Sequence, residues 1–174
     1  MQATLQLPGE RWKHSYLSLV QEFRANREPL IPFVLDFPTD DFGTFLENLS
    51  NCSAGKALPG NFVPHTTYWL VDENDAVVAV SNLRHRLTDS LRVEGGHVGY
   101  GVRPSARRCG YGARILAETL KKAKEHGIDR ALLTCAKTNS GSAKIIVKNG
   151  GVLDSEEFIP TRDAVVQRYW ILID

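Results

Sequence analysis

The segment 97–126 constrains the fold of this chain more than any other. Residues 97–104, HVGYGVRP, read as a β-strand that ends at Pro104, and the apolar residues between Gly112 and His126 recur at the spacing of an amphipathic α-helix. A turn that contains glycine joins the two elements. A strand that leads into a helix in this way predicts an α/β (α+β) fold.

The rest of the chain adds further helices and strands to this pair. Helices are predicted over residues 11–27, 39–49, 87–96 and 140–149, and the second of these begins at Thr39 as its N-cap. Strands are predicted over residues 66–72, 76–84, 130–135, 151–158 and 164–173. Residues 50–65 are rich in Gly, Pro, Ser and Asn, which predicts a loop. No repeat or linker divides residues 1–174, so we expect a single domain.

Composition excludes several classes of protein. The formal charge of the 174-residue chain is +1, which argues against a broad nucleic-acid-binding surface. No apolar run is long enough to cross a bilayer, and the N-terminus lacks the pattern of a signal peptide. The three cysteines, Cys52, Cys109 and Cys135, are far apart, which indicates neither disulfides nor a zinc site. We therefore expect a cytoplasmic protein with inert thiols that binds no nucleic acid, membrane or metal ion.

The turn before the main helix has the composition of an anion site. The first turn of a helix has unpaired N–H groups and a partial positive charge, and glycines such as Gly110 and Gly112 let a phosphate approach the backbone. Arg107 and Arg108 add charge and forked donors. The alternative, that the glycines only shape a tight turn and the arginines are solvated, stays open on spacing alone. A dinucleotide fingerprint is excluded, because Ile115 stands where its third glycine belongs.

Two ordered motifs resemble those of the GNAT superfamily of N-acyltransferases. The pattern Arg-x-x-Gly-x-Gly at 107–112, at a strand–helix junction, is similar to the acyl-CoA pyrophosphate signature of that family. The pattern Asn-x-x-Ser at 139–142, followed by Lys-Asn-Gly at 148–150, is similar to a second segment of the family. The Gly-Tyr-x-Val pattern at 99–102 also resembles an acetyltransferase subgroup. With the order of strands and helices, the resemblance covers about residues 66–173.

The resemblance implies a mixed β-sheet of five to seven strands that is flanked by helices and splays open beside the strand at 97–103. Acetyl-CoA, the implied cosubstrate, would bind in that opening, with its pyrophosphate on backbone N–H groups and its pantetheine along the strand. Asn139 and Ser142 would contact the pantetheine or the thioester, and Asn139 is also a good N-cap for the following helix. The implied cofactor-binding residues are Val102, Arg107, Arg108, Cys109, Gly110, Tyr111, Gly112, Ala113, Asn139 and Ser142.

The implied activity is transfer of the acetyl group to a primary amine, of a small molecule or a protein, by direct attack in a ternary complex. Because a lysine-like amine has a pKa of about 10.4, a base or a local lowering of that pKa is needed. His97, where the subgroup often has Glu, and Glu94 are the candidate bases; the alternatives are a hydrogen-bonded strand histidine and a solvated carboxylate. Arg84 and His85 are candidates for binding an acidic group of the substrate, or are surface residues.

The sequence departs from the family at the general acid. Many members carry a Tyr on the last helix, four residues beyond the Ser/Ala position, but Ile146 occupies that place here and Gly151 replaces the usual Phe. A proton for the leaving thiolate would come from Tyr100, Tyr169 or water, or the thiolate would leave unaided. Tyr100 is at the same time a candidate for packing or for the wall of the substrate site.

Other functions stay open on the sequence alone. Without that tyrosine the chain would be a non-catalytic acyl-CoA-binding module, and the same turn would suit a phosphate- or nucleotide-binding domain. The loop at 50–65 and the N-terminal helices are expected to shape the acceptor pocket, but they name no acceptor. The last strand, 164–173, is expected to offer an edge for a second copy, which would give a homodimer.

Overall fold

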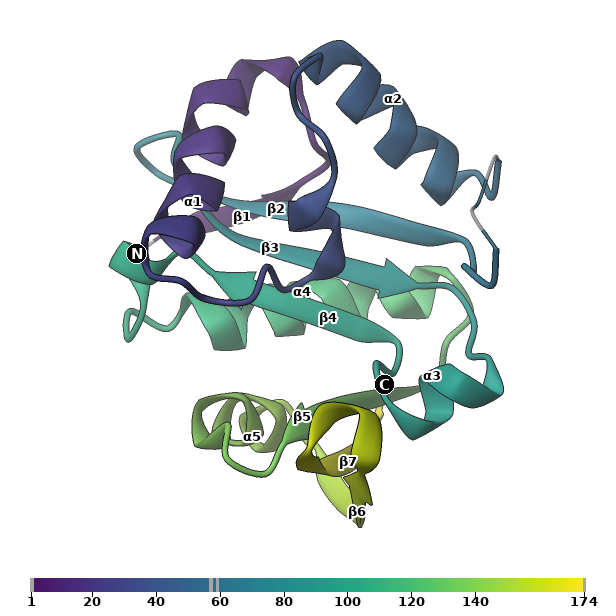
Figure 1. Cartoon of the computed structure of the whole chain (residues 1–174). Coiled ribbons are helices and arrows are strands. Elements are labelled where there is room, and N and C mark those ends of the chain that lie inside the picture. Colours follow the sequence, from purple (N-terminus) through teal and green to yellow (C-terminus); the bar gives the residue numbers. More distant parts are fainter. Residues whose placement is uncertain (1, 57, 59, 174) are drawn as a thin grey trace.

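The computed structural model describes residues 2–56, 58 and 60–173 and consists of two β-sheets flanked by helices (Figure 1). The strands are β1 (Ala3–Gln6), β2 (His65–Asp72), β3 (Val77–Arg84), β4 (Val98–Val102), β5 (Arg130–Ala136), β6 (Val152–Ile159) and β7 (Ala164–Leu172). The α-helices are α1 (Lys13–Ala25), α2 (Phe42–Ser53), α3 (Asp89–Val93), α4 (Tyr111–Glu125) and α5 (Ser140–Lys148). Single 3₁₀ turns are η1 (Glu10–Trp12), η2 (Phe33–Asp36), η3 (Pro104–Ala106) and η4 (Pro160–Arg162).

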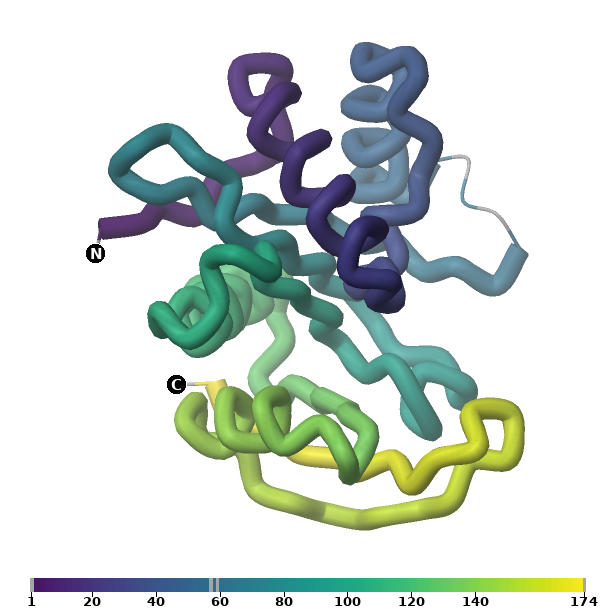
Figure 2. The backbone as a smooth tube through the Cα atoms, turned by 60° about the vertical axis from the view of Figure 1, so that its left-hand side comes forward, coloured from purple at the N-terminus to yellow at the C-terminus, as the bar shows by residue number. Residues whose placement is uncertain are grey.

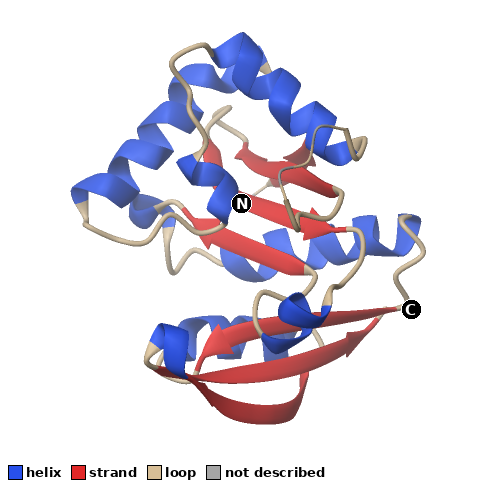
Figure 3. Cartoon of the chain, turned by 45° about the vertical axis from the view of Figure 1, so that its right-hand side comes forward, coloured by secondary structure: helices blue, strands red, loops and turns tan. Residues whose placement is uncertain are grey.

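Helices cover both faces of the larger sheet. Its strand order is β1-β2-β3-β4, with α1 and α2 on one face and α4 on the other (Figure 3). Because both faces are covered, the side chains of β2 from His65 to Val71 are all buried. The smaller sheet has the order β5-β7-β6, and α5 packs against β5 and α4.

Aromatic side chains fill the layer between the larger sheet and the N-terminal helices. Trp69 of β2 is fully buried, and the ring of Tyr16 from α1 stacks on it with centroids 4.5 Å apart. Phe42 and Phe45 of α2 are buried beside Tyr16. Offset and tilted ring pairs of this kind stabilise a core beyond the area that they bury. This layer fixes α1 and α2 on the sheet and so positions the segment that follows α1.

The two sheets meet at one short stretch and then diverge (Figure 2). His97 N donates to Leu132 O at 2.7 Å, and Leu132 N donates to His97 Nδ1 at 2.9 Å. Gly96 (φ 60°) lies so close that an added Cβ would stand 2.4 Å from Leu132 O, a contact that only glycine permits. No hydrogen-bonded ladder joins β4 to β5 within the described residues. The predicted α/β fold with a splayed sheet is thus confirmed, and every ladder within the two sheets is antiparallel.

Two predicted helix and loop boundaries are wrong at the second helix. The helix α2 begins at Phe42, because Asp41 rather than Thr39 is the N-cap and accepts hydrogen bonds from Gly43 N and Thr44 N. The helix also continues to Ser53, so the first residues of the predicted loop at 50–65 are helical.

The strands also differ from the prediction in two ways. The sequence analysis missed β1, a four-residue strand that pairs with β2 from Ala3↔Asp72 to Gln6↔Trp69. The last strand, β7, lies between β5 and β6 and is paired along both edges, so the expectation that it offers an edge to a second copy is wrong. The edge strands of this sheet are β5 and β6.

Replacing Gly96 tests the contact between the sheets. We expect Gly96→Ala to lower the free energy of unfolding by about 3 kcal/mol, because the new Cβ meets Leu132 O and the backbone is left-handed. Gly127→Ala is the matched control: Gly127 has a similar φ of 74° but nothing within 4 Å of an added Cβ, so about 1 kcal/mol is expected. Urea denaturation measures both, and equal losses would contradict a close contact at Gly96.

Candidate functional site

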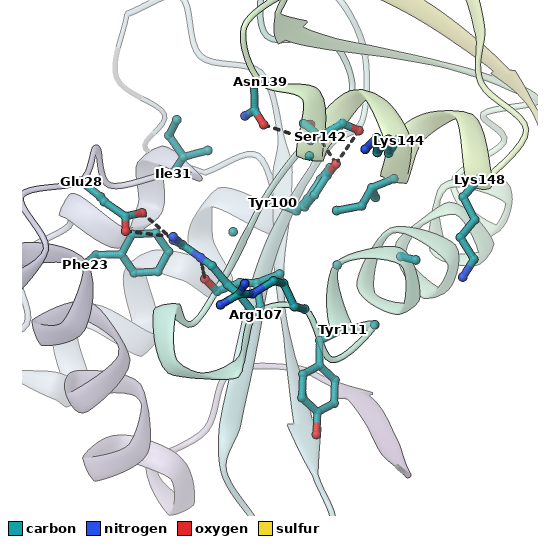
Figure 4. Close-up of a pocket in the computed structure, with 18 of the residues that line it drawn as sticks. Phe23, Glu28, Ile31, Tyr100, Arg107, Tyr111, Asn139, Ser142, Lys144 and Lys148 are labelled. Atoms are coloured by element: carbon teal, nitrogen blue, oxygen red, sulfur yellow. Dashed lines mark hydrogen bonds and ion pairs between the residues drawn. The ribbon is translucent and has the colours of Figure 1, made fainter.

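A cavity of about 700 Å³ lies between β4, the N-terminus of α4, the helix α5 and the segment that follows α1 (Figure 4). The structure brings the two sequence motifs together here: every predicted cofactor-binding residue except Cys109 lines the cavity. Cys109 is exposed and its Sγ donates to Arg107 O at 3.4 Å, so its predicted contact with the cofactor, through the backbone N–H, stays a prediction. Residues of the N-terminal segment, among them Phe23, Glu28 and Ile31, complete the wall and were not predicted.

The N-terminus of α4 presents backbone donors to this cavity. Gly110 is the N-cap and takes the left-handed conformation at φ 84°, which lets the chain turn sharply into the helix. The first helical hydrogen bond runs from Arg114 N to Gly110 O at 3.1 Å. The N–H groups of Gly112 and Ala113 therefore have no acceptor inside the helix, and both residues line the cavity. Donors of this kind, at the positive end of the helix dipole, attract an anion.

Side chains add four positive charges, one of which is already paired. Arg107 makes a two-pronged contact with Glu28, 2.9 Å to Oε1 and 2.5 Å to Oε2, and its Nε donates to Val102 O. These hydrogen bonds hold the pKa of Glu28 below its usual value. The side chains of Arg108, Lys144 and Lys148 make no hydrogen bond or ion pair with the described part of the chain, so their charges are available to a ligand. Arg107 instead ties the N-terminal segment to the turn.

The edge of β4 that faces the cavity carries unpaired backbone groups. At one end of the β3–β4 ladder, Arg84 N donates to His97 O at 2.8 Å. Antiparallel strands form hydrogen bonds at alternate residues, so the backbone groups of Gly99 and Gly101 face β3 and those of Tyr100 face the opposite edge. Since β5 forms no ladder there, the N–H and C=O of Tyr100 are open to a ligand.

Tyr100 and Ser142 join the two sides of the cavity. The Tyr100 Oη lies 2.9 Å from Ser142 Oγ. Burial raises the pKa of Tyr100 to about 12, so the phenol is protonated at neutral pH. Asn139 Oδ1 accepts a hydrogen bond from Ser142 N at 3.0 Å, which makes Asn139 the N-cap of α5 as predicted. Asn139 also lines the cavity. Ile146, in the place of the family tyrosine, is fully buried.

His97 and Glu94, the two candidate bases, lie outside the cavity wall. The Nδ1 lone pair of His97 accepts from Leu132 N, so the hydrogen of the neutral ring is on Nε2 and no lone pair is left for a substrate. Burial first, and then the charges of Arg92 and Arg84, lower the pKa of His97 to about 4. Glu94 forms an ion pair with Arg162 at 2.5 Å. The catalytic roles of these two residues stay predictions.

The two residues predicted to bind substrate lie side by side in sequence but have different surroundings. Arg84 lines a second cavity, and its Nη1 donates to the carbonyl oxygens of Gly95 and Gly96. His85 instead has its Nε2 at 2.8 Å from Thr66 Oγ1, and its ring stacks on that of His126 with centroids 4.0 Å apart. The His85 side chain is therefore held by Thr66 and His126, and it lines neither cavity.

Comparison with known proteins assigns the family. The profile of the Acetyltransferase (GNAT) family matches residues 21–150, which is most of the chain. The chain therefore belongs to the GNAT family of acetyltransferases and is an acyltransferase. No curated protein matches the sequence significantly.

Solved structures with the same fold include two that modify ribosomal proteins. One, from Salmonella typhimurium, modifies the N-terminal serine of 50S ribosomal subunit protein L7/L12 (14% identity, 100% of this chain and 96% of that chain covered, TM-score 0.70). Another is the ribosomal-protein-S5-alanine acetyltransferase from Vibrio fischeri (16% identity, 100% and 94% covered, TM-score 0.68). A third is yncA from Salmonella typhimurium, solved with its cofactor acetyl-CoA (14% identity, 99% and 94% covered, TM-score 0.62). At these identities the likeness establishes the fold.

Two kinds of feature are absent from the described part of the chain. No helix in residues 2–56, 58 and 60–173 is long and apolar enough to span a membrane. In the same part of the chain, no group of three or more His, Cys, Asp or Glu side chains is arranged to hold a metal ion.

The buried histidines predict how stability depends on pH. Burial lowers the pKa of both His65 and His97 from 6.5 to about 4, so these rings stay neutral in the folded state between pH 7.5 and 5.5. The unfolded chain takes up protons below pH 6.5, and the free energy of unfolding should therefore fall by about 1 kcal/mol for each histidine at pH 5.5. Urea titrations at the two pH values measure this. A His97→Gln variant should be less stable at both and show a smaller difference between them; an unchanged difference would contradict the prediction.

Proposed function

We propose that this protein transfers the acetyl group of acetyl-CoA to a primary amine by direct attack in a ternary complex. The observation that carries the proposal is the cavity itself, which connects the backbone donors at the start of α4 to the unpaired edge of β4. A reducing, cytoplasmic location goes with it, because Cys52, Cys109 and Cys135 are all free thiols.

Acetyl-CoA fits the chemistry of the cavity from end to end. Its diphosphate would accept hydrogen bonds from the N–H groups of Gly112 and Ala113, with Arg108 supplying positive charge beside them. Its pantetheine would lie along the open edge of β4. The thioester would then lie near the side chains of Tyr100 and Ser142.

The reaction forms a C–N bond and breaks a C–S bond. The neutral amine attacks the thioester carbonyl, the Tyr100 N–H stabilises the oxyanion, and CoA leaves as a thiolate. The attacking nitrogen loses one proton to water, and the sulfur gains one from a donor in the site that water then reprotonates. We assign the donor at the sulfur to the Tyr100 phenol, because Ile146 has no proton to give and the phenol lies within the cavity. One of the similar proteins named above modifies the N-terminal serine of a ribosomal protein, which supports an amine as the acceptor.

A charge reversal tests the cofactor site. We expect Arg108→Glu to weaken acetyl-CoA binding at least tenfold, about 1.4 kcal/mol, because the carboxylate would stand beside the diphosphate. Arg114→Glu is the matched control, since Arg114 is exposed in the first turn of the same helix but does not line the cavity. Isothermal titration calorimetry measures both affinities. Failure of the unaltered protein to bind acetyl-CoA would refute the proposed function.

A second substitution tests the proton donor. We expect Tyr100→Phe to lower kcat about 100-fold, because the leaving thiolate loses its hydrogen-bond donor, while the affinity for acetyl-CoA stays within about threefold. Tyr169→Phe is the control: its Oη donates to Gln167 Oε1 at 2.8 Å and the residue does not line the cavity. Release of free CoA thiol gives the rates with any amine that is turned over. Equal losses in the two variants would remove Tyr100 from this role.

A further inference from the structure

A second cavity, of about 530 Å³, lies where β2 begins and β3 ends. Its walls are mostly apolar: the rings of Phe33, from η2, and Phe62 meet edge to face with centroids 5.3 Å apart, and Val63 and Leu91 also line it. A cavity of this size and composition suits a small molecule, with a few polar groups to orient it.

Arg84 supplies a positive charge to this cavity that no acidic side chain neutralises. Its Nη1 donates to two backbone carbonyls, but its Nε and Nη2 make no hydrogen bond, and its guanidinium no ion pair, with any residue the structure describes. Glu94, which directly precedes the two glycines whose carbonyls Arg84 holds, is itself paired with Arg162. Burial lowers the pKa of Arg84 to about 10, which leaves it charged at neutral pH. A partly buried cation with two unused donors is a site for an anion.

His65 points to the same kind of ligand independently. It is 1% exposed, lines the second cavity, and is the direct cross-strand partner of Arg84. The Asn82 amide donates to His65 Nδ1 at 2.8 Å, so the ring hydrogen is on Nε2. That Nε2 atom is buried and has no hydrogen-bond partner among the described residues. An unsatisfied buried N–H costs free energy, which a bound oxygen acceptor would recover.

The second cavity lies next to the site where the acetyl group would be transferred. Ile31 lines the first cavity and Phe33 lines the second, so only a three-residue segment separates them. That segment rests on β4: a Cβ added to Gly99 would lie 3.4 Å from Pro32 Cβ. A molecule in the second cavity is therefore close to the strand whose open edge would hold the thioester.

We propose that the second cavity binds the acceptor and selects an amine that also carries a carboxylate and an apolar group, such as a free apolar amino acid. The carboxylate accepts hydrogen bonds from Arg84 and His65 Nε2–H, and the apolar group packs against the rings of Phe33 and Phe62. This inference rests on the proposed function, since it names the acceptor class for that reaction. It disfavours polyamines, which carry no carboxylate and would meet the charge of Arg84.

Binding of an acceptor fragment without an amine tests the cavity directly. We expect 3-phenylpropionate to bind the unaltered protein, and its amide, 3-phenylpropanamide, to bind at least tenfold more weakly by calorimetry. Arg84→Gln should reduce 3-phenylpropionate binding at least tenfold. Arg86→Gln, the control, removes the same charge from an exposed residue outside the cavity and should have no effect.

Because Arg84 also holds two carbonyls, Phe62→Ala provides a second variant: Phe62 is 43% exposed, and its truncation should weaken binding without unfolding the chain. Equal affinity for acid and amide, or no binding of the acid, would overturn the inference.

Turnover separates this inference from the proposed function. With saturating acetyl-CoA, we expect kcat/KM for L-phenylalanine to exceed that for L-phenylalaninamide, 2-phenylethylamine and spermidine at least tenfold. If one of the three amines without a carboxylate is acetylated as well as L-phenylalanine or better, the acceptor class is wrong and the acetyltransferase activity stands. If acetyl-CoA itself does not bind, the proposed function fails, whatever 3-phenylpropionate does.

Discussion

The contact between Gly96–His97 and Leu132 is the constraint on which the site depends. His97 satisfies both backbone groups of Leu132, one through its own N–H and the other through its ring nitrogen. The imidazole accepts the hydrogen bond that a backbone carbonyl oxygen would accept in a regular ladder. The strand β5 is therefore held against the start of β4 without a ladder that would continue along both strands. If such a ladder continued, β5 would occupy the backbone groups of Tyr100, and the edge that faces the cavity would be closed. One buried side chain thus joins the sheets and also ends their pairing.

The two cavities present hydrogen-bond donors of different kinds. At the start of α4, the donors are mainly backbone N–H groups, which are fixed by the helix and need no side-chain ordering. In the second cavity, the donors are the side chains of Arg84 and His65, which are cross-strand partners at the ends of β3 and β2. The segment from Ile31 to Phe33 separates these environments and is anchored on β4. Under the proposed function, selection of the two substrates is therefore divided between elements that come from different parts of the chain.

The sequence predicted best what local physics determines. The helix α4 begins within one residue of its predicted start, and Asn139 caps α5, because the apolar period, the capping residue and the glycines all lie within the same short segments. The start of α2 was misplaced, because Thr39 and Asp41 are both good N-caps and only the backbone geometry selects between them. The strand β1 was missed, because four residues carry too little pattern and its pairing partner lies more than sixty residues away.

The walls of the cavities could not be read from the sequence. Glu28 reaches Arg107 across 79 positions, and no local pattern signals that pairing. The surroundings of His97 were also hidden, because the group that occupies its lone pair is the backbone of a distant strand. Arg84 was singled out for its charge, whereas His65 was overlooked, since a lone histidine at the start of a strand gives no sign of an unsatisfied ring nitrogen. Such features depend on tertiary packing.

The central position of β7 has a consequence for how the molecule is made. Both β5 and β6 pair only with β7 among the described strands, so neither can enter a sheet before β7 has been synthesised. The helix α5, which supplies one wall of the first cavity, packs on α4 and on β5, so one of its two supports joins a sheet only at the same moment. On the ribosome, the larger sheet can therefore collapse early with its N-terminal helices, while the ligand-binding half waits for the final strand to emerge.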